Sequence, residues 1–519
     1  MEPTPPPFRD RIQGAFPLLS VILAVAFFAW QLTIMDVVTP NFDEGVYLLQ
    51  ARRVLAGQVP YSDFFYHQTP LYLYVLAAFG ALASPSLWSA RLLSLIAATV
   101  CGIVVAAIAR RWLSVPAAIA SQIFFYGAPL LRYGVIALPN APMLLASSSA
   151  MLALIRVGGR RGAVVAGICL AIAVLFKPLD IPVVLAAGLW LLIGRDTVRT
   201  LPWLVASGTL TALVAAAFFQ WLSGGGFAEM LALQIGRYAG NSGFEVMSHY
   251  SDFRDALAAR GVSTPVGWSF SEHLASLSGS EIRYGNPLLV VAGLAGLMAG
   301  FRALPARSGS LLVLWLVLPL AFSLMVWEPA WDHYFMQYVP VLALGGGMLV
   351  QAAVTRGRLS GALALALVGG YAALEIVTRP TEPWYYQRTR DIARATHGRY
   401  FTFTPVMHAI GETTPACDFI DPQNVYGEYC AAMFDPDGPL TRFRVTADDV
   451  LRCIGKDLPV VIDRTAFWFL DARLWSELQA RRHPLIFFDH AAKLRFGSGP
   501  APQPPPLSLS RPTPHDRRG

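Results

Sequence analysis

Long apolar runs separated by short basic clusters dominate the sequence. Most runs are about 15–22 residues long, which is the length that a helix needs to cross the hydrocarbon core of a bilayer. If every basic cluster lies in the cytoplasm, about eleven transmembrane helices separate the clusters. The predicted spans are residues 16–35, 87–109, 114–131, 139–155, 163–176, 181–193, 202–222, 287–301, 311–326, 334–350 and 359–377. The basic clusters are Arg9/Arg11, Arg110/Arg111, Arg156/Arg160/Arg161, Arg195/Arg199, Arg302/Arg307 and Arg356/Arg358. The chain is therefore predicted to be an α-helical polytopic membrane protein.

One apolar stretch, residues 71–83, does not fit this alternation. It is too short for a comfortable span, and counting it as one would move Arg110 and Arg111 to the outer side. We therefore expect a membrane-embedded or interfacial helix on the outer side. No small-residue cleavage site follows the first span, so we expect it to remain in the protein and residues 1–15 to be cytoplasmic.

Composition excludes a water-soluble protein. Apolar residues make up 55% of the 519 residues, charged residues 14%, and the mean hydropathy is +0.48. An average soluble protein carries roughly 25% charged residues, so this chain has too few polar groups to cover a water-exposed surface. The net charge of +7 is less informative than the positions of the basic residues.

The polar segments divide the chain. The predicted transmembrane domain, residues 16–377, contains a first outer loop at residues 36–86 and a middle outer loop at residues 223–286. Residues 378–498 are predicted to form a small α/β extracytoplasmic C-terminal domain, with strands at 399–404, 459–463 and 485–489 and a helix at 471–481. The Pro-rich residues 499–519 are expected to be disordered. Cys417, Cys430 and Cys453 allow at most one disulfide in the C-terminal domain.

The first outer loop carries the residues best suited to chemistry. Asp43 and Glu44 follow the first span and begin a short amphipathic segment that ends at Gly57, and Asp63 and His67 come soon afterwards. A carboxylate at the lipid boundary can act as a general base that takes the proton of an acceptor hydroxyl. Alternatively, Asp43 is the N-cap of a helix that begins near Glu44, where negative charge is favoured. The residues alone leave both interpretations open.

The order of a first span, an Asp-Glu pair, an amphipathic helix and a His-containing Pro-Leu element resembles the GT-C class of membrane glycosyltransferases. More narrowly, it is similar to the family 39, protein-mannosyltransferase-like enzymes and their galacturonic acid and aminoarabinose transferase relatives. The Asp-Glu-x-x-Tyr-Leu-x-x-Ala-Arg run begins at Asp43, and residues 67–71 match a His-Pro-Pro-Leu-like element in which one proline is replaced. The resemblance implies a GT-C-like fold over about residues 16–377 and glycosyltransferase activity.

The resemblance also implies the reaction. A sugar would move from a polyprenyl-phosphate donor to a lipid, glycan or protein acceptor outside the cell, by an inverting direct displacement with Asp43 as the catalytic base. Lys177 and His333 would hold the carrier phosphate. Alternatively, Lys177 is a lysine that extends its ammonium group to the membrane interface, and His333 is an ordinary interfacial residue. The residues expected to bind substrates are Glu44, Tyr47, Tyr61, Asp63, His67, Gln68, Asn140, Lys177, His333 and Tyr334.

Asn140 stands where many of these enzymes carry a second acid. An amide cannot act as a base and is a weaker metal ligand than a carboxylate, so Asn140 argues against a tightly bound divalent cation. The sequence contains no clustered His or Cys ligands and no phosphate-binding Gly-rich loop. We therefore predict no cofactor and no metal; a divalent cation is compatible with the site but has no support.

Two other functions fit a polytopic chain. A transporter or flippase of a lipid-linked sugar usually has ionisable residues near the bilayer midplane, internal repeats or broken helices. The predicted spans carry almost no charge in their central turns, which favours an interfacial enzyme. The third interpretation is an inactive membrane scaffold that presents the C-terminal domain. We expect a multi-pass protein of the inner or plasma membrane with an extracytoplasmic active site and no nucleic-acid partner.

Overall fold

The computed structural model describes residues 8–128, 131, 135–194, 197–238, 287–301, 306–325, 332–377, 381–417, 419–420, 442–463, 472–481, 484–488 and 496–497. The predicted disordered tail, Cys430 and most of the middle loop lie outside these residues.

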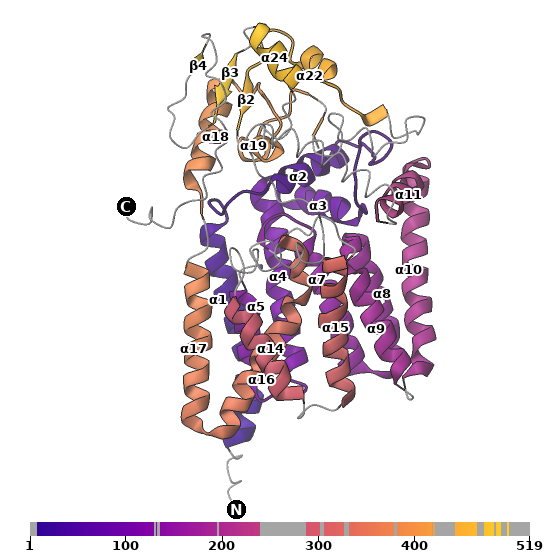
Figure 1. Ribbon diagram of the computed structural model, residues 1–519, viewed down its shortest axis with the longest axis vertical. Coiled ribbons are helices and arrows are strands. Elements are labelled where there is room, and N and C mark those ends of the chain that lie inside the picture. The colour runs from indigo at the N-terminus through magenta and orange to yellow at the C-terminus, as the bar shows by residue number, and fades with distance from the viewer. Residues whose placement is uncertain are drawn as a thin grey trace, which may run out of the picture.

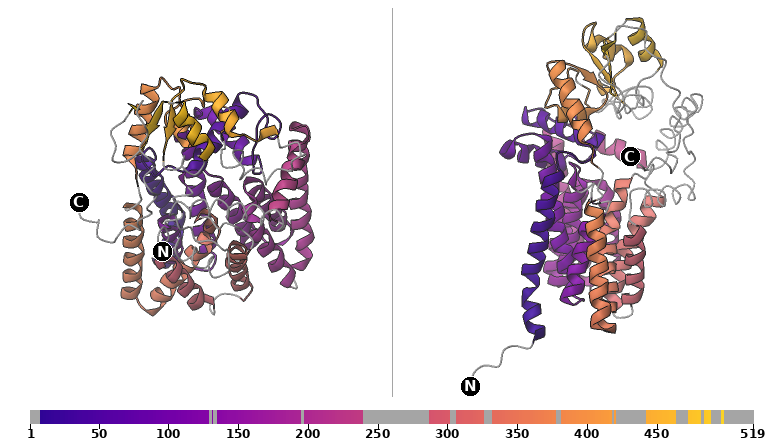
Figure 2. Two further views of the ribbon diagram at one scale, coloured as in Figure 1. Left: turned by 45° about the horizontal axis from the view of Figure 1, so that its top comes forward. Right: turned by 90° about the vertical axis from the view of Figure 1, so that its left-hand side faces the viewer.

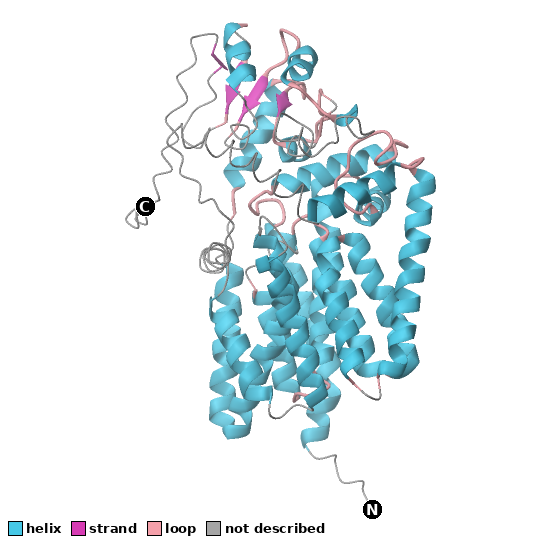
Figure 3. Ribbon diagram, turned by 45° about the vertical axis from the view of Figure 1, so that its right-hand side comes forward, coloured by secondary structure: helices cyan, strands magenta, loops and turns pink. Residues whose placement is uncertain are grey.

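Most of the chain forms a bundle of helices that run between two ends (Figure 1, Figure 3). The bundle helices are α1 (Phe8–Ile34), α4 (Leu87–Ala109), α5 (Val115–Gly127), α7 (Asn140–Leu152), α8 (Gly159–Phe176), α9 (Ile181–Ile193), α10 (Leu201–Leu222), α14 (Pro287–Phe301), α15 (Ala306–Met325), α16 (Val339–Arg356) and α17 (Arg358–Val377). Short turns of helix join or extend them: η2 (Ala153–Val157), η3 (Pro178–Asp180), η4 (Val198–Thr200) and η5 (Asp332–Tyr338).

A helix therefore forms at every predicted span, and α4, α9 and α14 have the predicted bounds. Within the described ranges, 6 helices are long and apolar enough to cross a membrane, and the others are shorter apolar helices. The chain is a helical membrane protein as predicted, while the number of spans stays a prediction.

One end of the bundle is covered, and we call it the capped end. Helices α2 (Phe42–Leu55) and α3 (Leu71–Ala83) and a small sheet lie over it, and α11 (Gly226–Tyr238) follows α10 there (Figure 1). Helix α3 lies across this end rather than through the bundle, in agreement with the prediction for residues 71–83. Arg110, Arg156 and Arg356 stand at the ends of α4, η2 and α16, which lie at the opposite end. The alternation of apolar runs and basic clusters therefore reflects antiparallel packing.

The sheet has the strand order β1-β2-β3-β4, formed by β1 (Phe401–Thr402), β2 (Val460–Ile462), β3 (Leu485–Phe487) and β4 (Phe496–Gly497). The first three strands are parallel and β4 is antiparallel to β3. All three residues of β2 are buried, as expected for a central parallel strand covered on both faces. Three strands were predicted, and β4 was not.

Among the described residues, four helices accompany the strands: α18 (Pro383–Ala395), α19 (Pro405–Ile410), α22 (Ala447–Ile454) and α24 (Ala472–Ala480). Only α24 was predicted. A disulfide joins Cys417 to Cys453 of α22, which agrees with the limit of one disulfide. The described residues between 383 and 497, which we call the sheet module, stand above α2 and α3 (Figure 2).

The sheet module and the first loop share one hydrophobic core. Tyr47 of α2 and Tyr72 of α3 belong to the same buried cluster as Phe403, Val406 and Val460 of the module. The bundle has a separate buried cluster. Because apolar surface is buried between them, the module and the first loop support one another.

Candidate active site

Asn41 starts α2 and places Asp43 in its first turn. The Asn41 side chain accepts a hydrogen bond from the backbone N of Asp43 at 2.9 Å, and the Glu44 carboxylate accepts one from the backbone N of Asn41 at 3.1 Å. This reciprocal arrangement is a capping box. The alternative in which Asp43 caps the helix is therefore wrong. The Asp43 side chain is half-buried at the helix end where the dipole favours negative charge.

Glu44 is fully buried and fully paired. Its two carboxylate oxygens accept hydrogen bonds at 2.7 Å from Nε and Nη2 of Arg91, which belongs to α4. The backbone N of Ala137 donates to Glu44 at 2.8 Å, and Arg91 also donates to the backbone O of Met35. These contacts link α2 to α4 and to the end of α1, so the geometry favours a role for Glu44 in positioning α2.

The sheet module packs directly on α2. Helix α19 contacts α2, and a Cβ on Gly45 would lie 2.1 Å from the backbone N of Val406. Only glycine allows two backbones to approach this closely. On the other side of Asp43, the Tyr386 hydroxyl of α18 donates to the backbone O of Val38 at 2.6 Å. The module thus holds the chain before and after Asp43.

Lys177 and Asn140 meet at the capped end of the bundle. Lys177 caps the C-terminus of α8, and its Nζ lies 3.4 Å from Oδ1 of Asn140 at the start of α7. Both side chains are buried. Burial lowers the pKa of Lys177 to about 8, and the negative charge of Asp43 acts in the opposite direction. Asp43 and Lys177 are therefore near enough to interact electrostatically, although they come from α2 and α8.

Tyr47 and Tyr61 are buried in an aromatic cluster below the sheet module. The Tyr47 ring contacts the edges of Tyr66 and Tyr72, with centroid distances of 6.3 and 5.3 Å. The Tyr61 hydroxyl donates to the backbone O of Gln68, and the backbone O of Tyr61 accepts a hydrogen bond from Arg442 of the module at 2.8 Å. Both tyrosines are 1% exposed, so their contacts shape the loop.

The remaining predicted residues of the first loop differ in exposure. Asp63 is exposed and accepts a hydrogen bond from the backbone N of Val59 at 2.7 Å. His67 and Gln68 are half-buried, and their side-chain nitrogens lie 3.0 Å apart. Next to them, the Thr69 hydroxyl lies 3.4 Å from the backbone O of Val174. The loop thus contacts α8 close to Lys177.

The predicted carrier-phosphate residues of the tenth span lie in η5. The backbone of His333 and Tyr334 belongs to this helix, while their side chains lie outside the described residues. Part of η5 contacts α7, which begins with Asn140. The helix that carries His333 therefore contacts the helix that begins with Asn140.

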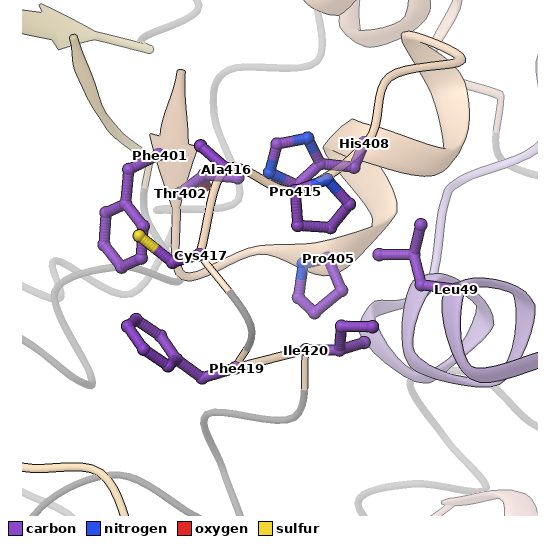
Figure 4. A pocket seen from close by; sticks show the side chains of 10 residues that line it. All are labelled: Leu49, Phe401, Thr402, Pro405, His408, Pro415, Ala416, Cys417, Phe419 and Ile420. Carbon is purple, nitrogen blue, oxygen red and sulfur yellow. The ribbon is translucent and has the colours of Figure 1, made fainter. Parts of the chain in front are cut away.

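A small pocket lies where the sheet module meets α2 (Figure 4). His408, one of its residues, stacks on Tyr400 at 4.5 Å, and its Nδ1 lies 2.8 Å from the Thr413 hydroxyl. Burial, with a smaller contribution from the positive charge of Arg52, lowers the pKa of His408 to about 3. A neutral, stacked histidine indicates a structural role. The pocket is lined by Leu49, Phe401, Thr402, Pro405, His408, Pro415, Ala416, Cys417, Phe419 and Ile420.

Among the described side chains, no group of three or more His, Cys, Asp or Glu residues is arranged to hold a metal ion. Asn140 directs its oxygen toward the Lys177 ammonium group. A divalent cation bound to this oxygen would be repelled by Lys177, so the donor set does not fit a metal here.

Arg91 is the site residue that the sequence interpretation missed. It is a charged residue in the second turn of an otherwise apolar span, and ionisable residues in such positions are usually functional or paired. That signal was available in the sequence, but its partner Glu44 stands 47 positions away, and sequence spacing gives no indication of the pairing.

Comparison with known proteins gives a family match over part of the chain. Residues 67–221 match the family described as dolichyl-phosphate-mannose-protein mannosyltransferase. The matched segment contains His67, Arg91, Asn140 and Lys177 and begins after Asp43. None of the curated proteins matches the sequence.

Solved structures share the fold at low sequence identity. ArnT from Cupriavidus metallidurans bound to undecaprenyl phosphate has a TM-score of 0.54 and 15% identity, with 84% of this chain and 91% of that chain covered. The Archaeoglobus fulgidus oligosaccharyltransferase tethered with an acceptor peptide has a TM-score of 0.51 and 12% identity, with 77% and 63% covered.

A further structure, the Archaeoglobus fulgidus protein AglB in complex with an inhibitory peptide and a dolichol-phosphate, has a TM-score of 0.50 and 13% identity. The match covers 77% of this chain and 64% of the archaeal chain. The likeness is one of fold, and it confirms the GT-C-like fold that the sequence predicts.

Proposed function

We propose that this GT-C-fold chain is a membrane glycosyltransferase that moves a hexose or pentose from a polyprenyl-phosphate donor to an acceptor on the outer side of the membrane. The acceptor is a lipid, a glycan or a protein. The observation that carries the proposal is the approach of a carboxylate from α2, Asp43, to a buried ammonium group at the end of α8, Lys177. These are the two charges that the transfer requires.

The phosphate carrier follows from the chemistry of Lys177. A buried lysine at the end of an apolar helix suits a phosphate whose lipid chain lies between helices, and it binds the phosphate as a point charge. Two structural relatives, ArnT and AglB, are complexes with undecaprenyl phosphate and a dolichol-phosphate, which supports the same class of donor here. The proposed phosphate position lies near Lys177 and His333.

The proposed reaction is an in-line displacement. The acceptor hydroxyl loses its proton to the Asp43 carboxylate while its oxygen bonds to the anomeric carbon. The bond from that carbon to the phosphate oxygen breaks, and its electron pair leaves with the polyprenyl phosphate. Lys177 stabilises the negative charge that develops on the phosphate, so this leaving group needs no proton. Attack opposite the leaving group inverts the anomeric configuration.

The other residues of the site are assigned supporting roles. Asn140 orients the Lys177 ammonium group, and Glu44 with Arg91 fixes the start of α2. His67, Gln68 and Tyr334 are proposed substrate contacts, whereas Tyr47, Tyr61 and Asp63 shape the loop that carries them. Arg110, Arg156 and Arg356, which end bundle helices, lie at the far end of the bundle, so we propose a cytoplasmic N-terminus and an extracytoplasmic capped end.

The first experiment tests Asp43. Membranes from a deletion strain would receive purified protein in nanodiscs and undecaprenyl-phosphate sugars labelled in the sugar, from a panel of hexoses and pentoses. We expect the label to become covalently attached to an acceptor in the membranes. Asp43→Asn should lower the rate by roughly 10²- to 10⁴-fold, because removal of a general base has effects of that size. Mass spectrometry of glycolipids and glycans would identify the acceptor.

A matched control uses the same charge change nearby. Asp36 is exposed and precedes the capping box of α2, so Asp36→Asn should retain the wild-type rate. Full transfer by a well-folded Asp43→Asn variant would remove Asp43 from the mechanism. In a parallel assay with the protein in sealed liposomes, label that crosses the bilayer without attachment to an acceptor would identify a flippase instead.

A further inference from the structure

Two short helices at the capped end carry buried polar side chains that form no hydrogen bonds within the described chain. Asp180 ends η3 and is 0% exposed, and neither of its carboxyl oxygens has a partner. Gln337 lies in η5 and is 1% exposed, and neither its amide oxygen nor its amide nitrogen has a partner. Unpaired buried groups are rare because each one loses its hydrogen bonds to water and gains nothing in return.

The neighbouring helix α15 adds two more groups of this kind. Trp315 Nε1 and Ser323 Oγ are also buried and unpaired among the described residues. Helix α15 packs against α9, which continues directly from η3, and also against η5. These two groups therefore lie on a helix that packs both on η5 and on the continuation of η3.

The packing of α9 on α15 allows the positions of Asp180 and Trp315 along the bundle axis to be compared. Height here means the distance along this axis toward the capped end. Trp190 Nε1 of α9 donates to the backbone O of Arg307 at the start of α15, which fixes the register of the two helices. At 1.5 Å per residue, Asp180 lies about 15 Å above Trp190, and Trp315 lies about 12 Å above Arg307. Asp180 and Trp315 are therefore at similar heights.

Asp180 is also next to the proposed phosphate position. Its backbone N donates to the backbone O of Lys177 at 3.2 Å, so the two residues are one turn of η3 apart, about 6 Å along the helix axis. On the other side, η5 contacts α7, which begins with Asn140, the partner of Lys177. A group attached to a phosphate at Lys177 would thus be adjacent to Asp180, and the helix that carries Gln337 contacts the helix that carries the partner of Lys177.

The chemistry of the unpaired groups matches hydroxyl groups. A carboxyl group without water, hydrogen bonds or a counterion is stable as the neutral acid, which has one donor and one or more acceptors. Ser147 of α7 is a neighbour of the Asp180 carboxyl group. Its hydroxyl, however, donates to the backbone O atoms of Met143 and Leu144 rather than to Asp180. The amide of Gln337 has two donor hydrogens and an acceptor oxygen. Sugar hydroxyls both donate and accept, whereas a phosphate only accepts and a lipid tail does neither.

We propose that Asp180 and Gln337 form a buried subsite that binds hydroxyl groups of the donor sugar. The inference rests on the proposed function, since it takes the phosphate to lie at Lys177. It assigns the choice of sugar to η3 and η5, away from the residues that hold the acceptor and the phosphate.

The test compares two lipids that differ only in the sugar. Protein in nanodiscs would be titrated with undecaprenyl phosphate and with undecaprenyl-phosphate mannose, followed by other hexoses and pentoses if mannose is not preferred. Wild-type protein should bind the preferred glycosylated carrier more tightly than the bare carrier. Asp180→Leu and Gln337→Leu should each weaken binding of the glycosylated carrier about tenfold and leave binding of the bare carrier unchanged. Neither variant should lower the thermal stability of the empty protein, because the replaced groups have no partners to lose.

Gln122→Leu provides the matched control. Gln122 is also a buried glutamine of the bundle, but its side chain bonds to Ser20 and Tyr126. This substitution should lower thermal stability without changing the ratio of the two affinities. A donor that lacks one sugar hydroxyl should bind less tightly to wild type. Removal of the same hydroxyl should cost less affinity in the variant that already lacks the side chain that contacts it.

The possible failures can be told apart. If wild type prefers the glycosylated carrier but Asp180→Leu and Gln337→Leu keep that preference, the subsite is wrong and the proposed function stands. A subsite that only holds ordered water gives the same result. If both carriers lose affinity equally, or Gln122→Leu also changes the ratio, the effect is one of packing and the subsite is again wrong. If wild type prefers no glycosylated carrier over the bare one, the proposed donor class fails.

Discussion

Removing Arg91 tests whether its buried pair with Glu44 holds the start of α2, and therefore Asp43. The substitution Arg91→Met deletes the two hydrogen bonds of 2.7 Å to Glu44. The Glu44 carboxylate, 0% exposed, would then keep only the backbone N–H groups of Asn41 and Ala137 among its observed partners. Removing one member of a buried ion pair costs about 3–5 kcal/mol, because the other charge is left uncompensated.

The cost should appear as easier opening of α2, since water can then reach the carboxylate. Hydrogen exchange followed by mass spectrometry on residues 41–55 in nanodiscs measures this opening. At about 1.4 kcal/mol for each factor of ten, the amide hydrogens of α2 should exchange about 10²- to 4 × 10³-fold faster than in wild type. The sugar-transfer rate should fall as well, because Asp43 lies in the first turn of the same helix.

Two further variants separate charge from geometry. Arg91→Lys keeps the positive charge but loses the paired hydrogen bonds of the guanidinium group, so exchange should be intermediate. The double variant Arg91→Met/Glu44→Gln removes both charges and should regain much of the protection lost in Arg91→Met. Exchange of α2 within about threefold of wild type in Arg91→Met would show that the pair does not stabilise this helix.

Three shorter predictions concern the module and the phosphate cation. Gly45→Ala places a Cβ 2.5 Å from the Cα of Val406, so the two backbones must separate. We expect faster proteolysis of the sheet module and slower sugar transfer. The control Gly188→Ala meets no atom within 4 Å and should behave as wild type. Because the pKa of Lys177 is lowered to about 8, its charge is lost as the pH rises, and kcat/KM for transfer should fall above pH 8; Lys177→Arg should remove this alkaline limb. The folded-state pKa of His408 is about 3 against an ordinary 6.5, so protonation favours unfolding below pH 6.5 by roughly 1.4 kcal/mol per pH unit. Hydrogen exchange of the module should accelerate accordingly, and His408→Asn should flatten the dependence.

The long apolar elements were predictable from sequence because length and hydrophobicity alone define them. Helices α4, α9 and α14 begin and end at the predicted residues, where polar residues or prolines interrupt the apolar runs. The short helix α19 was not predicted, since all six of its residues are buried and no alternation of polar and apolar positions marks it. Its position on α2 depends on the close approach at Gly45. A glycine in the sequence does not reveal which segment packs against it.

The candidate site was predictable in part for a similar reason. Asp43 and Lys177 stand out as charges beside apolar segments, whereas the pairing of Glu44 with Arg91 depends on the tertiary fold. A capping role was considered only for Asp43, as the alternative to catalysis, although Asn41 precedes Glu44 by three residues and that spacing is typical of a capping box. The local signal was present, and the adjacent Asp-Glu pair drew the interpretation away from it.

The buried polar groups at the capped end fall into two sets with different energetic consequences. Glu44 and Arg91 are desolvated but satisfied by each other and by backbone groups, so they specify one position of α2 and gain nothing from a ligand. Asp180 and Gln337 are desolvated and unpaired among the described residues, so they lower stability in the empty protein, and apolar replacements would pack there at no loss. Groups that reduce stability persist where function requires them. The satisfied set therefore belongs to the frame that holds Asp43, and the unsatisfied set is expected to gain its hydrogen bonds when the donor sugar binds.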